Sequence, residues 1–134
     1  MNEESFIFAD TPPRPSGPSR LALISEATDV LALLESLATE LAFPAWCGNN
    51  WDALLDCLRD LTWISEHTVV IYHQKLPVLG REELKTYISI LDIAVGEWID
   101  RNEHELVVGF PRAAGPLIRD LLDDWRNTER WSPE

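Results

Sequence analysis

Three short apolar segments, separated by stretches with helical periodicity, constrain the fold of this chain most strongly. The segments span residues 21–24, 68–72 and 106–110 and are rich in Leu, Ile and Val. Short apolar runs of this kind are typical of buried strands. Because each strand is followed by a helical stretch before the next one, the connections are crossovers and the strands run parallel. The sequence therefore predicts an α/β fold, a small three-stranded parallel sheet packed with helices.

Apolar residues at spacings of three and four predict four helices. The first begins near Thr28, which can cap it, and ends before Pro44. The second begins at Asn49 or Asn50, either of which can cap it. The other two helices are predicted over residues 81–101 and 115–127. The last one follows the third strand and is an extra C-terminal helix.

The composition of the two ends differs from that of the middle. Four of the nine residues 11–19 are proline, which fixes φ and removes a backbone donor, so this stretch is expected to be extended or disordered. Residues 5–9 before it are compatible with a short added strand. We therefore expect a proline-rich N-terminal extension (1–20), an α/β domain (21–110) and a C-terminal helical extension packed on the same domain (111–134).

The charge is strongly acidic and regional. The chain carries 23 acidic and 11 basic side chains, a net charge of −12. Residues 26–60 hold seven acids and one base and so contribute −6 of that charge. Direct binding to nucleic acid needs clustered Lys and Arg, so this balance argues against it. A charged partner is expected to be basic.

The sequence has neither the long apolar run of a membrane span nor the start of a secretory signal. We therefore expect a cytoplasmic protein without a membrane partner. Cys47 and Cys57 are too few for a disulfide scaffold and lack CxxC spacing, so they are interpreted as free thiols in a reducing compartment.

The common catalytic motifs are missing from the sequence. It contains no glycine-rich phosphate loop, no GxSxG and no HExxH. The three histidines, His67, His73 and His104, are far apart along the chain and favour no metal site. We expect no enzyme activity, no cofactor and no metal.

Three aspartates recur every four residues in the second helix. Asp52, Asp56 and Asp60 share one face there and could bind a cation, act as acid and base, or form a solvated face. Like charges four residues apart destabilise a helix. A row of unfavourable charge is plausible where a cationic partner neutralises it.

Residues 43–58 read Phe-Pro-Ala-Trp-Cys-Gly-Asn-Asn-Trp-Asp-Ala-Leu-Leu-Asp-Cys-Leu. This stretch closely resembles the signature of barstar, the intracellular inhibitor of the ribonuclease barnase: a proline, an aromatic residue, a Gly-x-Asn turn, then Asp-Ala-Leu-x-Asp-Cys-Leu without a gap. A weaker resemblance in the order of elements extends over residues 21–110. The resemblance implies a three-stranded parallel sheet packed with helices, which agrees with the fold predicted above.

The resemblance also implies a function, inhibition of a basic ribonuclease by occlusion of its active site. Asp56 would occupy the site of a substrate phosphate, and Asp52 would pair with a second cationic group. Trp46 takes the position of a tyrosine that packs against a catalytic histidine, while Gly48 and Asn50 would shape the binding loop. The implied partner is an extracellular or toxin ribonuclease, bound 1:1, to which this chain confers immunity.

At three positions the family pattern does not match this sequence directly. Leu55 stands where the best-known member has a tryptophan, and Arg59 replaces a small polar residue beside the acidic face; both are counted among the partner-binding residues. Glu97 is the nearest candidate for a glutamate that the family uses late in its long helix. The alternative function is a non-inhibitory interaction module whose two extensions are the working parts.

Overall fold

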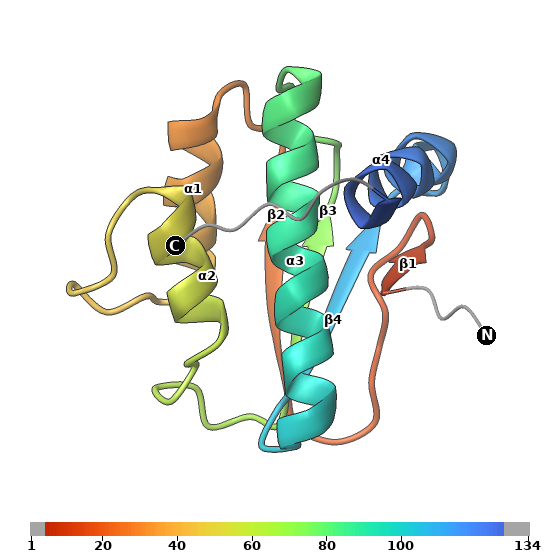
Figure 1. Cartoon of the computed structure of the whole chain (residues 1–134). Coiled ribbons are helices and arrows are strands. Elements are labelled where there is room, and N and C mark those ends of the chain that lie inside the picture. Colours follow the sequence, from red (N-terminus) through yellow and green to blue (C-terminus); the bar gives the residue numbers. More distant parts are fainter. Residues whose placement is uncertain (1–4, 128–134) are drawn as a thin grey trace.

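The computed structural model describes residues 5–127, and the predicted α/β class is confirmed (Figure 1). The elements follow in the order β1 (Phe6–Phe8), β2 (Ser19–Ile24), α1 (Val30–Glu40), α2 (Trp51–Leu58), β3 (Thr68–His73), α3 (Arg81–Arg101), β4 (Glu105–Phe110), the 3₁₀ turn η1 (Arg112–Ala114) and α4 (Gly115–Asn127). The two long C-terminal helices coincide with the predicted ones.

Within the described residues the sheet has four strands, in the order β1-β4-β3-β2, and every pairing is parallel. The prediction of three strands lacked β1, which comes from the N-terminal extension, where the sequence was compatible with an added strand. Phe6 and Phe8 hold β1 in place because both rings pack on Phe110 of β4. The ring centroid of Phe6 lies 5.5 Å from that of Phe110, and the ring centroid of Phe8 lies 6.2 Å from it.

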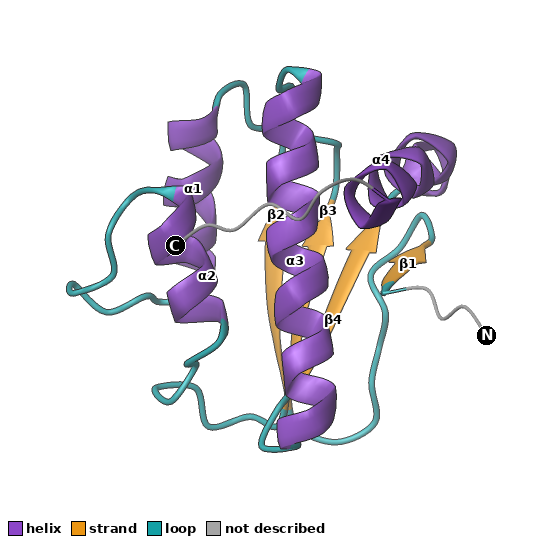
Figure 2. Cartoon of the chain, in the orientation of Figure 1, coloured by secondary structure: helices purple, strands orange, loops and turns teal. Residues whose placement is uncertain are grey.

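The helices pack on the sheet in the arrangement that Figure 2 shows, with α3 in front of the strands, α1 and α2 on one side of it and α4 on the other. The central strand β3 is buried along its whole length. The largest fully buried side chains are Trp98, Tyr87 and Phe110, which belong to α3 and β4. The core therefore lies between the sheet and its helices, with buried side chains from all four of the described α-helices.

Side-chain caps start the two short helices. Asp29, and not the predicted Thr28, caps α1, because its Oδ1 accepts the Ala32 N–H at 2.8 Å. Asn50 caps α2 in the same way, with Oδ1 accepting the Ala53 N–H at 2.8 Å. Asn50 was one of the two predicted caps of α2. Because Asn50 is the residue that caps it, the acidic helix begins at Trp51.

The two extensions lie against each other and against the domain. Asp10 accepts a hydrogen bond from the Arg112 N–H at 3.1 Å. At a second place the Asp92 carboxylate of α3 accepts bonds from Ser5 and from Arg126 of α4. The proline-rich residues 11–18 join β1 to β2 and contain neither helix nor strand. Residues 1–4 and 128–134 of the predicted extensions lie outside the described part of the chain.

His73 at the end of β3 is a fully buried histidine. Its Nδ1 lies 2.8 Å from the Gly109 carbonyl oxygen and its Nε2 lies 2.7 Å from the Tyr87 hydroxyl. The ring also stacks on Phe110 at 4.2 Å. Burial lowers the pKa of His73 from 6.5 to about 4, although the bond to Gly109 works in the opposite direction. His73 is therefore neutral in the folded protein at neutral pH.

This lowered pKa predicts an acid-sensitive fold. Between pH 6.5 and about 4 the unfolded chain binds a proton at His73 that the folded chain does not, so the free energy of unfolding falls as the pH falls. The contribution of this one group is about 3 kcal/mol. Urea unfolding of the natural chain and of His73→Gln across this range measures it. A variant whose stability keeps the same pH slope as the natural chain would contradict the assignment.

Candidate protein-binding surface

The segment before α2 is a short hook, residues 43–50, that follows a reversal of the chain at the end of α1. Ala42 reverses the backbone with a left-handed φ of 54°. The Phe43 N–H then donates to the Ala38 carbonyl at 2.9 Å, and the Cys47 N–H donates to the Pro44 carbonyl at 3.0 Å. The hook therefore begins with a reversal of the chain and contains one tight turn, over residues 44–47, before it reaches α2.

The two cysteines form a disulfide between the hook and α2, which corrects the prediction of free thiols. Cys47 is partly buried in the hook and Cys57 is buried on the inner side of α2, with Cα atoms 6.5 Å apart. The spacing of ten residues gave no sign of this pairing, because it arises only when the hook folds back on the helix.

The carboxylates of Asp52 and Asp56 are exposed on α2. Asp52 lies in the first turn, where the positive end of the helix dipole favours a carboxylate. Asp60 differs from the prediction, because α2 ends at Leu58 and Asp60 lies partly buried beyond the helix. The acidic face therefore consists of two helical aspartates. Among residues 5–127 no group of three His, Cys, Asp or Glu side chains is placed to hold a metal ion.

Trp46 projects from the hook with 65% of its surface exposed. Its ring packs edge-on against Trp63 at 5.8 Å, and Trp63 packs in the same way against Phe43 at 5.8 Å. The Trp63 Nε1–H donates to the Leu41 carbonyl at 2.9 Å. Trp63 thus supports the ring of Trp46 by packing against it. The sequence could not assign this role, because Trp46 precedes α2 along the chain and Trp63 follows it.

Leu55 is not part of this exposed surface, which corrects its place among the predicted partner-binding residues. Only 2% of Leu55 is exposed, and it packs in the core together with Leu54 and Leu58. The helical phase of α2 turns Leu55 inward while Asp52 and Asp56 face solvent. Contact with a partner would require α2 to repack.

Gly48 and Asn50 are exposed on the hook, as a binding loop requires. A Cβ on Gly48 would meet the Ala53 Cβ at 3.4 Å, an ordinary contact, so the fold itself does not demand glycine there. The Asn50 Oδ1 is occupied by capping α2. Asn50 therefore belongs to the exposed surface and at the same time fixes the start of α2.

Arg59 lies at the C-terminal end of α2, where it caps the helix and pairs with α3. Its Nε lies 3.2 Å from Oε1 of Glu97. Glu97, a candidate from the sequence, therefore lies beside the predicted surface and neutralises the cation there. Arg101 of α3 donates to the Arg59 carbonyl, and its guanidinium stacks on Trp98 at 3.9 Å. These contacts attach the end of α2 to α3.

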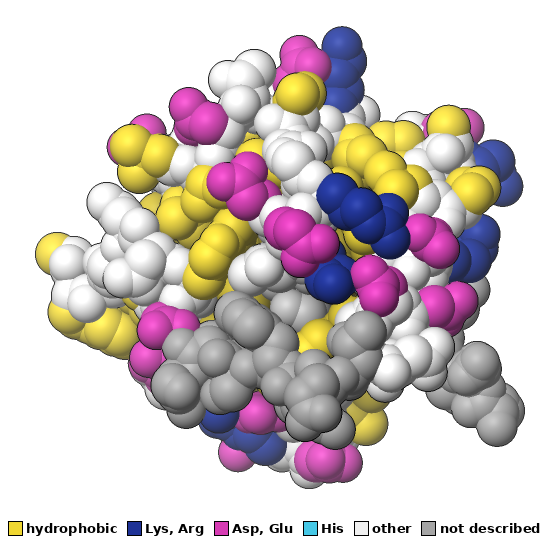
Figure 3. Space-filling model, turned by 45° about the horizontal axis from the view of Figure 1, so that its top comes forward, with side chains coloured by type: hydrophobic (Ala, Val, Ile, Leu, Met, Phe, Trp, Pro, Cys, Tyr) yellow, Lys and Arg dark blue, Asp and Glu magenta, His cyan; other side chains and the backbone are white. Residues whose placement is uncertain are grey.

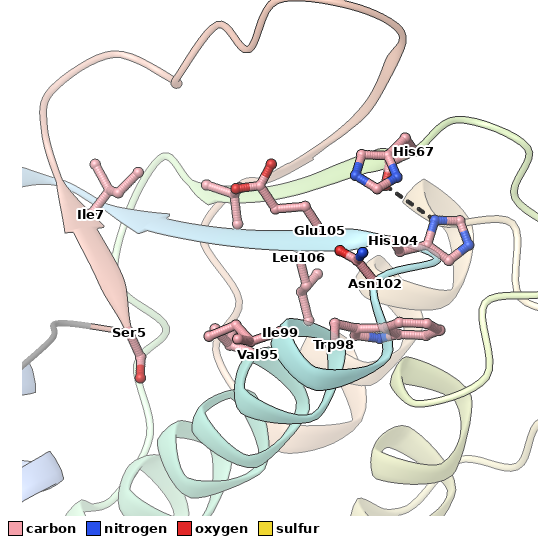
Figure 4. Close-up of a pocket in the computed structure, with 11 residues that line it drawn as sticks. Ser5, Ile7, His67, Val95, Trp98, Ile99, Asn102, His104, Glu105 and Leu106 are labelled. Carbon is pink, nitrogen blue, oxygen red and sulfur yellow. Dashed lines mark hydrogen bonds between the residues drawn. The ribbon is translucent and has the colours of Figure 1, made fainter.

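Acidic side chains are spread over the face that Figure 3 shows, between exposed apolar ones, and are not gathered in one patch. A cavity of about 460 Å³ lies elsewhere, where α3 meets β1 and β4 (Figure 4). Val95 and Ile99 of α3 line it together with Leu106 of β4, and none of the predicted partner-binding residues does. The predicted partner-binding residues therefore lie away from this cavity.

The family model described as Barstar (barnase inhibitor) matches residues 20–110, which include every element from β2 to β4 apart from the first residue of β2. Comparison with curated proteins gave no match, and neither did comparison with solved structures. The matched part holds the hook, α2 and both exposed aspartates, whereas β1 and α4 lie outside it. With two thirds of its length matched, this chain belongs to the barstar, or barnase inhibitor, family.

Proposed function

We propose that this protein inhibits a basic, barnase-type ribonuclease by covering its active site with the hook and α2. The observation that carries the proposal is the exposure of Asp52 and Asp56 on a helix held in place at both ends. A ribonuclease binds the phosphates of RNA with cationic groups. Carboxylates on a rigid helix present the same charge to those groups and cannot be cleaved.

Preorganisation supports this function. Asn50 caps the start of α2, the disulfide ties its last turn to the hook, and α3 holds its end. Groups that are already ordered lose little conformational freedom on binding, so more of the interaction energy remains as affinity. The net charge of −12 would also speed the approach of a cationic enzyme.

The exposed ring of Trp46 would supply the apolar part of the interface. Tryptophan is enriched among the side chains that contribute most to protein–protein affinity, particularly near the centre of an interface. Trp46 stands beside the acidic face and is supported by Trp63. The proposed contact therefore combines one aromatic anchor with two carboxylates.

The partner would be a secreted or toxin ribonuclease bound 1:1, and this protein would give immunity in the cytoplasm of the cell that makes the enzyme. No helix in residues 5–127 is both long and apolar enough to cross a membrane. The described parts of both extensions pack on the sheet and on α3, which gives them a structural role.

Removing the Asp56 carboxylate tests the proposed mechanism. The Asp56→Ala variant should fold normally, since the side chain is exposed, and should inhibit the ribonuclease at least about thirtyfold more weakly. Titration of barnase-catalysed RNA cleavage measures this change. Glu35→Ala is the matched control, because it removes an exposed carboxylate of α1 from the same acidic segment and should leave inhibition within a few-fold. Equal inhibition by Asp56→Ala and the natural chain would refute the mechanism.

Electrostatic attraction predicts a salt-dependent association rate. Raising the salt concentration from about 50 to about 500 mM should slow association about tenfold or more and change dissociation far less. Stopped-flow fluorescence follows both rates, and Trp46 offers a reporter at the proposed interface. An association rate that does not respond to salt would contradict the role assigned to the acidic charge.

A further inference from the structure

The hook is lightly attached to the rest of the protein. Five of its eight residues are exposed, namely Ala45, Trp46, Gly48, Asn49 and Asn50. Its backbone hydrogen bonds to Ala38 and Pro44 lie at its beginning and within its own turn. What ties its middle to the body of the protein is the packing of Trp46 on Trp63 and the bond between Cys47 and Cys57.

The disulfide lies between the two parts of the proposed binding surface. Cys47 directly follows Trp46, and Cys57 directly follows Asp56. The bond therefore fixes the aromatic anchor of the hook relative to the critical carboxylate of α2. The ring that it closes also contains Asp52.

We propose that the Cys47–Cys57 bond is a redox-sensitive clamp, so that the oxidised protein inhibits its ribonuclease more tightly than the reduced protein. This inference rests on the proposed function and adds regulation to the same site. In the reduced state α2 keeps its core packing through Leu54 and Leu58, while the hook loses its covalent tie. Binding must then order the hook, and that cost lowers the affinity. We expect reduction to weaken inhibition about tenfold to a hundredfold, the range that loss of one short cross-link allows.

The chemistry of the switch is thiol–disulfide exchange. Cys47 is the more exposed of the two cysteines, so an external thiolate attacks its Sγ and the Cys57 sulfur leaves as a thiolate, which then takes up a proton. A second external thiol resolves the mixed disulfide. In total the two external thiols are oxidised to one external disulfide, and the Cys47–Cys57 disulfide is reduced to two protein thiols. A small-molecule disulfide such as oxidised glutathione drives the reverse reaction.

The setting of the proposed function favours such a switch. Disulfides are rare in reducing compartments, and those that form there are usually transient or redox-sensing. Binding and oxidation are also thermodynamically linked. If oxidation lowers the Kd for the ribonuclease by a given factor, binding of the ribonuclease stabilises the disulfide against reduction by the same factor. The complex should therefore resist reduction more strongly than the free protein does.

The test compares the oxidised full chain with the same chain reduced by dithiothreitol, using barnase as the probe. We expect the Kd, measured from inhibition of RNA cleavage, to rise at least tenfold on reduction. The Cys47→Ser/Cys57→Ser double variant should bind like the reduced chain and should not respond to dithiothreitol. That variant controls for effects of the reductant on the enzyme. Equal Kd values for the oxidised and reduced chains would overturn the proposal.

Hydrogen exchange of the free protein separates this inference from the proposed function. Reduction should speed exchange of the amides of residues 45–50 about tenfold or more and leave those of β3 unchanged. Should the oxidised chain fail to inhibit barnase, the proposed function fails for that enzyme, and exchange then decides the clamp alone. Unchanged exchange in the hook would overturn the clamp. The reduced natural chain provides the comparison even if the double variant does not fold.

Discussion

The attachment of α2 to α3 is the constraint on which the binding surface depends. A helix of eight residues is not stable by itself in water, so its position must come from its surroundings. The Trp98 Nε1–H donates to the Leu58 carbonyl at 2.7 Å, and Arg101 donates to the Arg59 carbonyl. These bonds satisfy carbonyl oxygens that the end of a helix leaves unpaired. The long helix α3 thereby sets the direction in which Asp52 and Asp56 point.

The rest of the fold supports α3. Its inner face packs on the buried strand β3 and on β4, and Tyr87 links it to the His73 network. The described parts of the extensions complete this arrangement, since β1 covers the edge of β4 and α4 packs beside α3. An open edge of a parallel sheet is a site for unwanted pairing. The N-terminal extension thus contributes to the sheet of the domain that carries the site.

Local patterns were enough to predict most of the fold. The apolar periodicity of α3 and α4 predicted both helices with their observed bounds, and Asn50 was one of the two residues predicted as possible caps of α2. Features that depend on distant parts of the chain were missed. The disulfide needs the hook to fold back, and the support of Trp46 by Trp63 needs the turn after α2 to return beside the hook. Leu55 was placed at the surface by resemblance, although its own helical phase already placed it inside.

The central claim is that the hook and α2 occupy the place of the RNA substrate. Steady-state kinetics of barnase, measured at several concentrations of RNA and of the oxidised full chain, test it most directly. A protein that occupies the substrate site raises KM in proportion to its concentration and leaves kcat unchanged. We predict this competitive pattern, with inhibition complete when RNA is scarce. A fall in kcat at unchanged KM, or no inhibition of barnase at all, would contradict the account.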